Sequence, residues 1–144
     1  MKKRIKNRLS FLLLSLLGFA ATSCKEPLDM YGTPRADFRA QGKVTDKEGN
    51  PLRGIQVRSE QYDSKEVLTA DDGSYDISGS MFPSHITLSF TDIDGPENGG
   101  EFTEQHLDIK FTEADRTGKG GEWYSGSFAR SGVDVRMQEK EEQE

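Results

Sequence analysis

Short runs in which apolar and polar residues alternate, separated by turn-forming residues, occupy the chain from Phe38 onward. A strand with one buried face shows this two-residue period, because successive side chains point to opposite sides of a sheet. Residues 85–92, HITLSFTD, are the clearest case, and no run of useful length has the period of a helix. The pattern predicts strands at residues 38–45, 52–59, 66–69, 74–77, 85–92, 107–111, 123–128 and 133–137. Short strands spread over about 100 residues predict an antiparallel β-sandwich of about seven strands.

Glycine-containing turns separate the first strands. Gly49 in DKEGNP and Gly73 in DDG can adopt the positive φ that such turns require. The block GKVTDKEGNPLRGIQV, followed by TADDGSYDI, resembles the carboxypeptidase-regulatory-like, or transthyretin-like, modules of secreted bacterial proteins. The matching positions are Gly42, Asp46, Gly49, Pro51, Leu52, Gly54, Ile55, Val57, Thr69, Asp72, Gly73 and Tyr75. The resemblance implies an all-β, Ig-like or transthyretin-like sandwich.

The amino-terminal segment has the layout of an export signal. Residues 11–21 form an apolar run, and the basic residues before it are Lys2, Lys3, Arg4, Lys6 and Arg8. The run has eleven residues, whereas a membrane-spanning helix needs about 20. The layout therefore predicts a signal peptide that is removed rather than retained in the membrane.

Cys24 is the sole cysteine, and it directly follows the small residues Ala21, Thr22 and Ser23. This resembles the lipobox of bacterial lipoproteins, in which the thiol receives a diacylglycerol and the chain is cut just before it. Ala21 departs from that pattern, which usually has a larger aliphatic residue there. The resemblance implies a signal peptide at 1–23, lipidation of Cys24 and an outer membrane lipoprotein of the cell envelope, on either the periplasmic or the surface face. The alternative is an ordinary signal peptide cut near Ala21, which leaves a free cysteine in an oxidising compartment.

Cleavage before Cys24 would leave 121 residues with 14 basic and 25 acidic side chains, a net charge of −11. A surface this acidic repels phosphate backbones, so it disfavours binding to nucleic acid. The length suits one domain. We expect a lipidated tether at 24–37, the sandwich at 38–137, and a charged, disordered tail at 138–144, QEKEEQE.

A narrower resemblance combines four segments of the chain. The lipobox, the MYGTP segment at 30–34, the GKVTDKEGNPL block and DIDGPENGGEF at 92–102 are similar to lipoproteins of Bacteroidetes encoded beside a radical-SAM enzyme. The resemblance implies an association with that maturation enzyme, in which this chain would be the substrate. A thioether bridge requires a cysteine, and lipid would occupy Cys24. Modification of Tyr31, Tyr124 or another side chain is the remaining form of this hypothesis.

The acidic segment 92–101, DIDGPENGGE, is the main candidate for an ion site. Asp92, Asp94, Asn98 and Glu101 carry the oxygen ligands that calcium prefers. The segment does not match an EF-hand loop, because its glycine comes too early and the third acid is missing. The alternative is a strand end and a wide turn whose Asp and Asn side chains bond to their own backbone. No other cofactor is predicted.

Trp123 and Tyr124 are flanked by glycines and would suit an exposed platform for sugar rings. A lone tryptophan in a small sandwich is more often part of the core, because large aromatic side chains dominate burial there. We therefore predict that Trp123 is buried. The same reasoning predicts burial of Tyr75, Phe90 and Phe111.

Motifs for catalysis are few in this sequence. His85 and His106 lie 21 positions apart without the Cys or His neighbours that zinc generally needs, and we predict both at strand edges. Neither a G-x-S-x-G elbow nor an H-E-x-x-H motif occurs. We expect a non-catalytic module, tethered through Cys24 to membrane lipid, that binds an envelope protein or a glycan. A substrate of a radical-SAM enzyme is the second hypothesis. A small envelope hydrolase, which would need a buried acid or histidine in a pocket, is the third.

Overall fold

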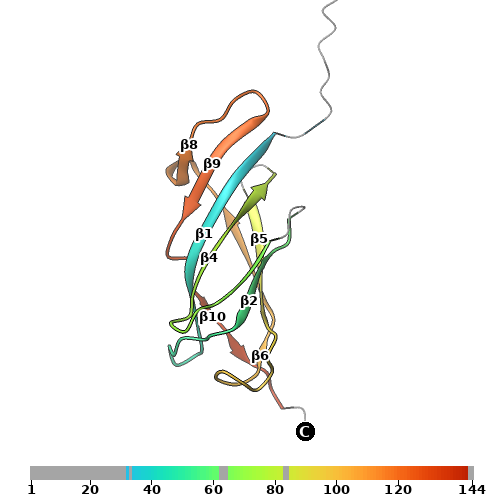
Figure 1. Cartoon of the computed structure of the whole chain (residues 1–144), viewed down its shortest axis with the longest axis vertical. Coiled ribbons are helices and arrows are strands. Elements are labelled where there is room, and N and C mark those ends of the chain that lie inside the picture. Colours follow the sequence, from blue (N-terminus) through green and yellow to red (C-terminus); the bar gives the residue numbers. More distant parts are fainter. Residues whose placement is uncertain (1–31, 33, 62–64, 83–84, 143–144) are drawn as a thin grey trace, which may run out of the picture. The chain divides into compact units, whose positions relative to one another are not determined.

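A computed structural model describes residues 32, 34–61, 65–82 and 85–142 of the chain. All described strands belong to the unit formed by residues 33–144. They form two main sheets whose inner faces share one apolar core (Figure 1). The prediction of an all-β sandwich is confirmed.

The first sheet is built around β1 (Arg35–Thr45). Strand β4 (Ser74–Met81) pairs with it antiparallel along eight residues, from Ala36 opposite Met81 to Lys43 opposite Ser74. On its other side, β9 (Tyr124–Arg130) and β10 (Val135–Arg136) each pair with β1 in parallel, one with each half of the strand. The sequence predicted an antiparallel sandwich and contained no indication of these parallel pairings.

The second sheet has the order β3-β2-β5-β7, and every neighbouring pair is antiparallel. Its strands are β3 (Glu66–Leu68), β2 (Ile55–Ser59), β5 (His85–Asp92) and β7 (Gln105–Lys110). A small third sheet pairs β6 (Phe102–Thr103) with β11 (Gln138–Glu139). The predicted bounds of β5 are confirmed at both ends.

Aromatic rings from the two sheets meet inside the core. The rings of Tyr75 on β4 and Phe90 on β5 pack edge to face, with centroids 5.5 Å apart. Phe111 directly follows β7. The centroid of its ring is 6.4 Å from that of Phe38 and 6.2 Å from that of Phe128, and both of these residues belong to the first sheet. The predicted burial of Tyr75, Phe90 and Phe111 is confirmed.

The predicted burial of Trp123 is wrong, since 41% of this residue is exposed. Trp123 immediately precedes β9, in the turn that connects β8 (Arg116–Gly118) to that strand. Trp123 therefore lies one residue outside the paired strand, where it stays partly exposed.

Several strands extend beyond the alternating runs. β1 begins at Arg35, three residues before the predicted start, and β4 continues to Met81 because it stays paired with β1 to that point. Residues 116–118, expected in a loop, form β8, and a 3-10 turn, η2 (Glu113–Asp115), precedes them. Residues 138–139, expected in a disordered tail, form β11. Leu52, expected in the second strand, lies outside it but is buried.

The turn after β1 has the predicted geometry. Gly49 has φ +91°. One carboxylate oxygen of Asp46 accepts hydrogen bonds from the backbone N–H groups of Glu48 and Asn50, each at 2.9 Å. Gly73 also has positive φ, +76°, and a Cβ there would meet the carbonyl oxygen of Val44 at 2.5 Å. Glycine at these two positions therefore lets the chain reverse next to β1.

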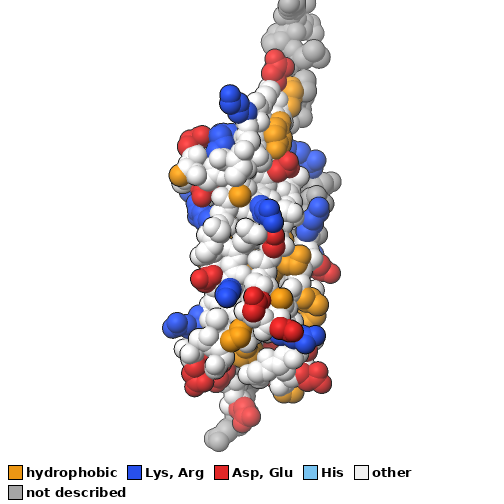
Figure 2. Space-filling model, turned by 60° about the vertical axis from the view of Figure 1, so that its left-hand side comes forward, with side chains coloured by type: hydrophobic (Ala, Val, Ile, Leu, Met, Phe, Trp, Pro, Cys, Tyr) orange, Lys and Arg blue, Asp and Glu red, His pale blue; other side chains and the backbone are white. Residues whose placement is uncertain are grey.

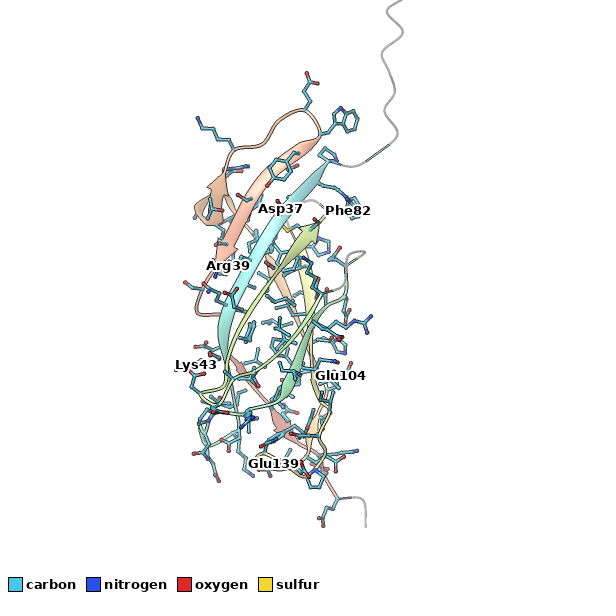
Figure 3. All side chains as sticks on the ribbon, in the orientation of Figure 1. Asp37, Arg39, Lys43, Phe82, Glu104 and Glu139 are labelled. Atoms are coloured by element: carbon cyan, nitrogen blue, oxygen red, sulfur yellow. The ribbon has the colours of Figure 1, made fainter. Side chains whose placement is uncertain are left out.

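Figure 3 distinguishes the two ends of the sandwich. Asp37 and Phe82 lie at the end where β1 begins, and Glu139 lies at the other end. The turn before β9 lies at the first end, and β6 lies at the second (Figure 1). Exposed side chains of these elements therefore lie together at one end of the sandwich or at the other.

Candidate functional site

The outer face of the second sheet is polar. Along β5, the inward side chains Ile86, Leu88 and Phe90 are fully buried in the core. The intervening residues, Thr87, Ser89 and Thr91, face the opposite side because side chains alternate along a strand. β2 and β7 flank β5 and continue this polar face on either side.

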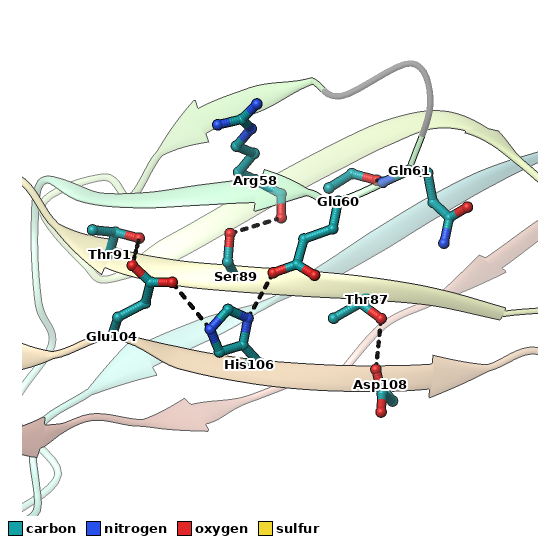
Figure 4. A network of polar contacts seen from close by, with 10 residues as sticks. Arg58, Glu60, Gln61, Thr87, Ser89, Thr91, Glu104, His106 and Asp108 are labelled. Atoms are coloured by element: carbon teal, nitrogen blue, oxygen red, sulfur yellow. Dashed lines mark hydrogen bonds and ion pairs between the residues drawn. The ribbon is translucent and has the colours of Figure 1, made fainter.

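His106 on β7 lies at the centre of a side-chain network on this face (Figure 4). Its Nδ1 is 2.6 Å from Oε1 of Glu60, and its Nε2 is 3.0 Å from Oε1 of Glu104. Glu60 directly follows β2, whereas Glu104 directly precedes β7. The imidazole therefore connects two carboxylates from separate parts of the sheet.

Further hydrogen bonds hold the surrounding side chains. The Thr91 hydroxyl donates to Oε2 of Glu104 at 3.2 Å, and the Thr87 hydroxyl donates to Asp108 at 2.6 Å (Figure 4). An open depression of about 490 Å³ lies on the same face. Its lining residues are Gln56, Arg58, Glu60, Gln61, Ser89, Thr91 and Glu104.

The chemistry of this network suits the binding of polar groups. Ionised carboxylates accept hydrogen bonds but do not donate them, so both contacts are hydrogen bonds only when His106 carries a proton on each nitrogen. About half of each side chain is exposed: 54% for His106, 41% for Glu60 and 49% for Glu104. Ion pairs this exposed contribute little to stability. Their oxygens and N–H groups remain accessible to a partner.

Glu60 and Glu104 are not among the site residues that the sequence predicted. His106 was predicted only as a strand-edge residue, and β7 is an edge strand of its sheet. His85, in contrast, begins β5, which has partners on both sides. The sequence of residues 104–110 could have indicated that Glu104 and His106 share a polar face, because the polar residues at even positions alternate with Leu107 and Ile109.

The predicted calcium ligands largely bond to their own neighbours. Oxygens of Asp92 accept hydrogen bonds from the backbone N–H of Asp94 at 3.2 Å and of Phe102 at 3.0 Å. Burial, followed by the side-chain contact with Asp94, raises the pKa of Asp92. The Asn98 amide donates to Asp94, and Glu101 is 2.7 Å from Nζ of Lys140. The structure thus brings Asp92, Asp94 and Asn98 together but pairs Glu101 with a lysine.

A group of three or more His, Cys, Asp and Glu side chains placed to hold a metal ion does not occur among the described residues. Calcium binding at this loop stays a prediction. Of the two tyrosines considered for modification, Tyr31 lies outside the described residues, as does Cys24. Tyr124 is 36% exposed, and its hydroxyl donates a hydrogen bond of 2.8 Å to Asp37, which raises the pKa of Tyr124.

No family model matches the sequence, and no curated protein matches it. Among solved structures, the chain is similar to a DUF3823 family protein from Parabacteroides merdae ATCC 43184, with 17% sequence identity and a TM-score of 0.39. The similarity covers 74% of this chain but only 47% of that one. That protein comes from a member of the Bacteroidetes. Within the described part of this chain, no helix is long and apolar enough to cross a membrane.

Proposed function

We propose that this chain is an envelope lipoprotein, acylated at Cys24, whose β-sandwich is a non-catalytic module that binds a protein or glycan partner. The polar face of the second sheet would be the binding surface. The observation that carries this proposal is the Glu60–His106–Glu104 network, which lies in the open on a sheet face. From here on, the term "polar face" is restricted to the part of this outer sheet face formed by the network together with Gln56, Arg58 and Thr91.

The side chains of the polar face are held in place by contacts with one another in the absence of a partner. His106 is held from both sides, and Glu104 is held by Thr91 as well. Side chains that are already ordered lose less conformational entropy on binding, so a weakly stabilising network still favours association. The same groups match hydroxyl groups of a sugar or polar side chains of a protein.

The buried polar side chains of the described residues are Ser59, Thr69 and Ser89, which are neither acids nor histidines. The hydrolase hypothesis requires a buried acid or histidine in a pocket. The histidine and carboxylates of the polar face are exposed instead. This arrangement favours a binding surface over a catalytic cleft as the hypothesis to test first.

The position of the sandwich in the chain suits a lipid anchor at Cys24. β1 begins at Arg35, eleven residues after Cys24. An extended chain covers at most about 3.6 Å per residue, so this connection spans up to about 40 Å. Two or three acyl chains on one residue would hold the protein durably at a bilayer.

Mass spectrometry of the protein purified from its host tests the anchor. A mature chain that begins at Cys24 and carries the mass of its acyl chains is the expected result. A Cys24→Ser variant should move from the membrane to the aqueous fraction. The proposal of an anchor is wrong if the wild type and the variant distribute alike.

Affinity capture from host envelopes, together with a glycan array, tests the polar face. We expect Glu104→Gln and His106→Gln to reduce retention of the bound partner by about tenfold, as loss of one or two charged hydrogen bonds would do. Glu141→Gln removes the same charge at an exposed position in the carboxyl-terminal segment and serves as the matched control. Equal retention by all three variants and the wild type would contradict the proposal.

A second proposal is that a radical-SAM enzyme modifies the chain. It is supported by exposure of the Tyr124 ring at the surface, where a large enzyme can reach it. The mass measurement tests this proposal as well. A mass beyond that of the lipid, mapped by fragmentation to a side chain, is the expected result, and a mass explained entirely by acylation would refute it.

A further inference from the structure

Exposed aromatic side chains are concentrated at one end of the sandwich. The large apolar side chains that are exposed among the described residues are Leu68, Phe82, Ile93, Trp123 and Tyr124. Phe82, Trp123 and Tyr124 surround the beginning of β1, and we call this set the aromatic end. In Figure 2, hydrophobic side chains are visible near this end of the molecule and also in the opposite half.

Arg35, the first residue of β1, connects the members of the aromatic end. Its backbone N–H donates to the carbonyl of Trp123 at 3.3 Å, and Tyr124 is its partner across the strand pair. Its guanidinium carbon lies 5.9 Å from the centre of the Phe82 ring. The three aromatic residues therefore lie around the beginning of β1, where the chain from Cys24 enters the sandwich.

The charges in the two segments that carry Trp123, Tyr124 and the beginning of β1 are balanced. In residues 34–37 and 119–124, Arg35 and Lys119 are offset by Asp37 and Glu122. Attraction of this end to another surface would therefore be mainly apolar. Tryptophan and tyrosine prefer the boundary between lipid and water, where the ring contacts apolar groups and the polar atom stays hydrated.

The opposite end of the sandwich is acidic. An open depression there is lined by Glu101, Glu139, Glu141 and Glu142 together with Lys140. Acidic side chains are repelled by anionic lipid headgroups. The difference between the two ends gives the sandwich a definite orientation at a bilayer.

We infer that the aromatic end lies against the lipid–water interface of the membrane that holds Cys24. This inference rests on the proposed acylation. The connection of up to about 40 Å between Cys24 and Arg35 allows the sandwich to reach the bilayer with this end first, because β1 begins there. The lipid surface is the occupant that fits exposed aromatic rings, balanced charge and an adjacent acyl anchor together.

Trp123 is the sole tryptophan of the chain, so its fluorescence reports on the aromatic end alone. The acylated protein is incorporated into phosphatidylcholine vesicles with or without brominated acyl chains. We expect the brominated lipid to reduce Trp123 emission about twofold, because the ring lies at the boundary of the acyl region. Emission should also shift to shorter wavelength relative to the Cys24→Ser variant in detergent-free buffer.

A double variant, Trp123→Phe with Ile93→Trp, moves the fluorophore to another exposed site. Ile93 is 53% exposed and directly follows β5, at the opposite end of the sandwich. We expect its emission to be insensitive to the brominated lipid. Circular dichroism confirms that the double variant retains the fold.

Co-sedimentation with the vesicles, measured on the same samples, separates the two proposals. Sedimentation of both proteins, with quenching of Trp123 in the wild type and no quenching of the relocated tryptophan in the double variant, supports the inference. Sedimentation with equal or absent quenching of the two fluorophores overturns the inference but leaves the anchor in place. Failure of the wild type to sediment overturns the anchor, and the inference with it.

Discussion

The contact between β1 and the segment before β10 can be tested by Gly42→Ala. Gly42 lies in β1 opposite Tyr75, and a methyl group at its position would overlap the backbone carbonyl of Val133. The same carbonyl accepts a buried hydrogen bond of 2.6 Å from the Tyr75 hydroxyl. Burial raises the pKa of Tyr75, so the hydroxyl stays protonated as a donor. The methyl group would therefore displace a carbonyl that is already in use.

Three hydrogen bonds depend on the position of this segment. Besides the Tyr75 bond, the N–H of Val133 donates to Gln41 at 2.9 Å, and the N–H of Lys43 donates to Asp134 at 2.9 Å. Each contributes about 1 kcal/mol, so their joint loss would lower the free energy of unfolding by about 3 kcal/mol. In a domain of this size, that corresponds to a fall in Tm of about 10–20 °C.

Thermal unfolding followed by circular dichroism measures the effect. Gly121→Ala is the matched control, because a Cβ at Gly121 would meet nothing within 4 Å and the residue has no positive φ. We expect Gly121→Ala to change Tm by less than about 3 °C, which corresponds to the usual effect of an exposed substitution. A Tm for Gly42→Ala equal to that of the control would refute the close contact between Gly42 and Val133.

Three further predictions concern single sites. Hydrogen bonding from Arg130 lowers the pKa of Asp115 to about 2, below its ordinary value of 3.8, so its contribution to stability should be lost as the pH falls from about 4 to 2. Asp115→Asn should lower stability by about 1 kcal/mol at pH 7 and flatten this acid transition in pH-dependent melts. The amide nitrogen of Gln105 is buried without a hydrogen-bond partner among the described residues, so Gln105→Met should raise stability by about 1 kcal/mol in urea unfolding; an unchanged or lower value would contradict this. Because the Asp92 carboxylate already accepts two backbone hydrogen bonds, we expect Tm to be the same in calcium and in chelator, and an increase of Tm in calcium would support the prediction of a calcium site instead.

The alternating pattern predicted the strands that have an apolar inner face. β5 is the clearest example, because its buried Ile86, Leu88 and Phe90 recur every second residue. β8 and β11 lack such a pattern, and they are strands because β9 and β6 supply their hydrogen bonds. The parallel pairing of β1 with β9 and β10 joins segments far apart in the chain, so local patterns contain no information about it.

The site could be predicted less well than the fold. Glu104 and His106 are two positions apart, but Glu60 is 46 positions from His106, and only the antiparallel register of β2, β5 and β7 brings Glu60 onto their face. For Trp123 the prediction was wrong, because the size of the residue indicated burial, whereas its position just before β9 leaves it exposed. In both cases the deciding information is the position of a residue in the sheet, which residue type does not determine.

The two proposed surfaces are compatible with each other because they occupy different parts of one sandwich. Phe82, Trp123 and Tyr124 lie where β1 begins, whereas the polar face lies on the outer side of the second sheet. If the aromatic end lies on the bilayer, the strands rise from the membrane and the polar face is directed sideways. A partner would then approach His106 from within the envelope space, without having to displace the sandwich from the lipid. The acidic end would lie farthest from the membrane, where its charge meets no lipid headgroups.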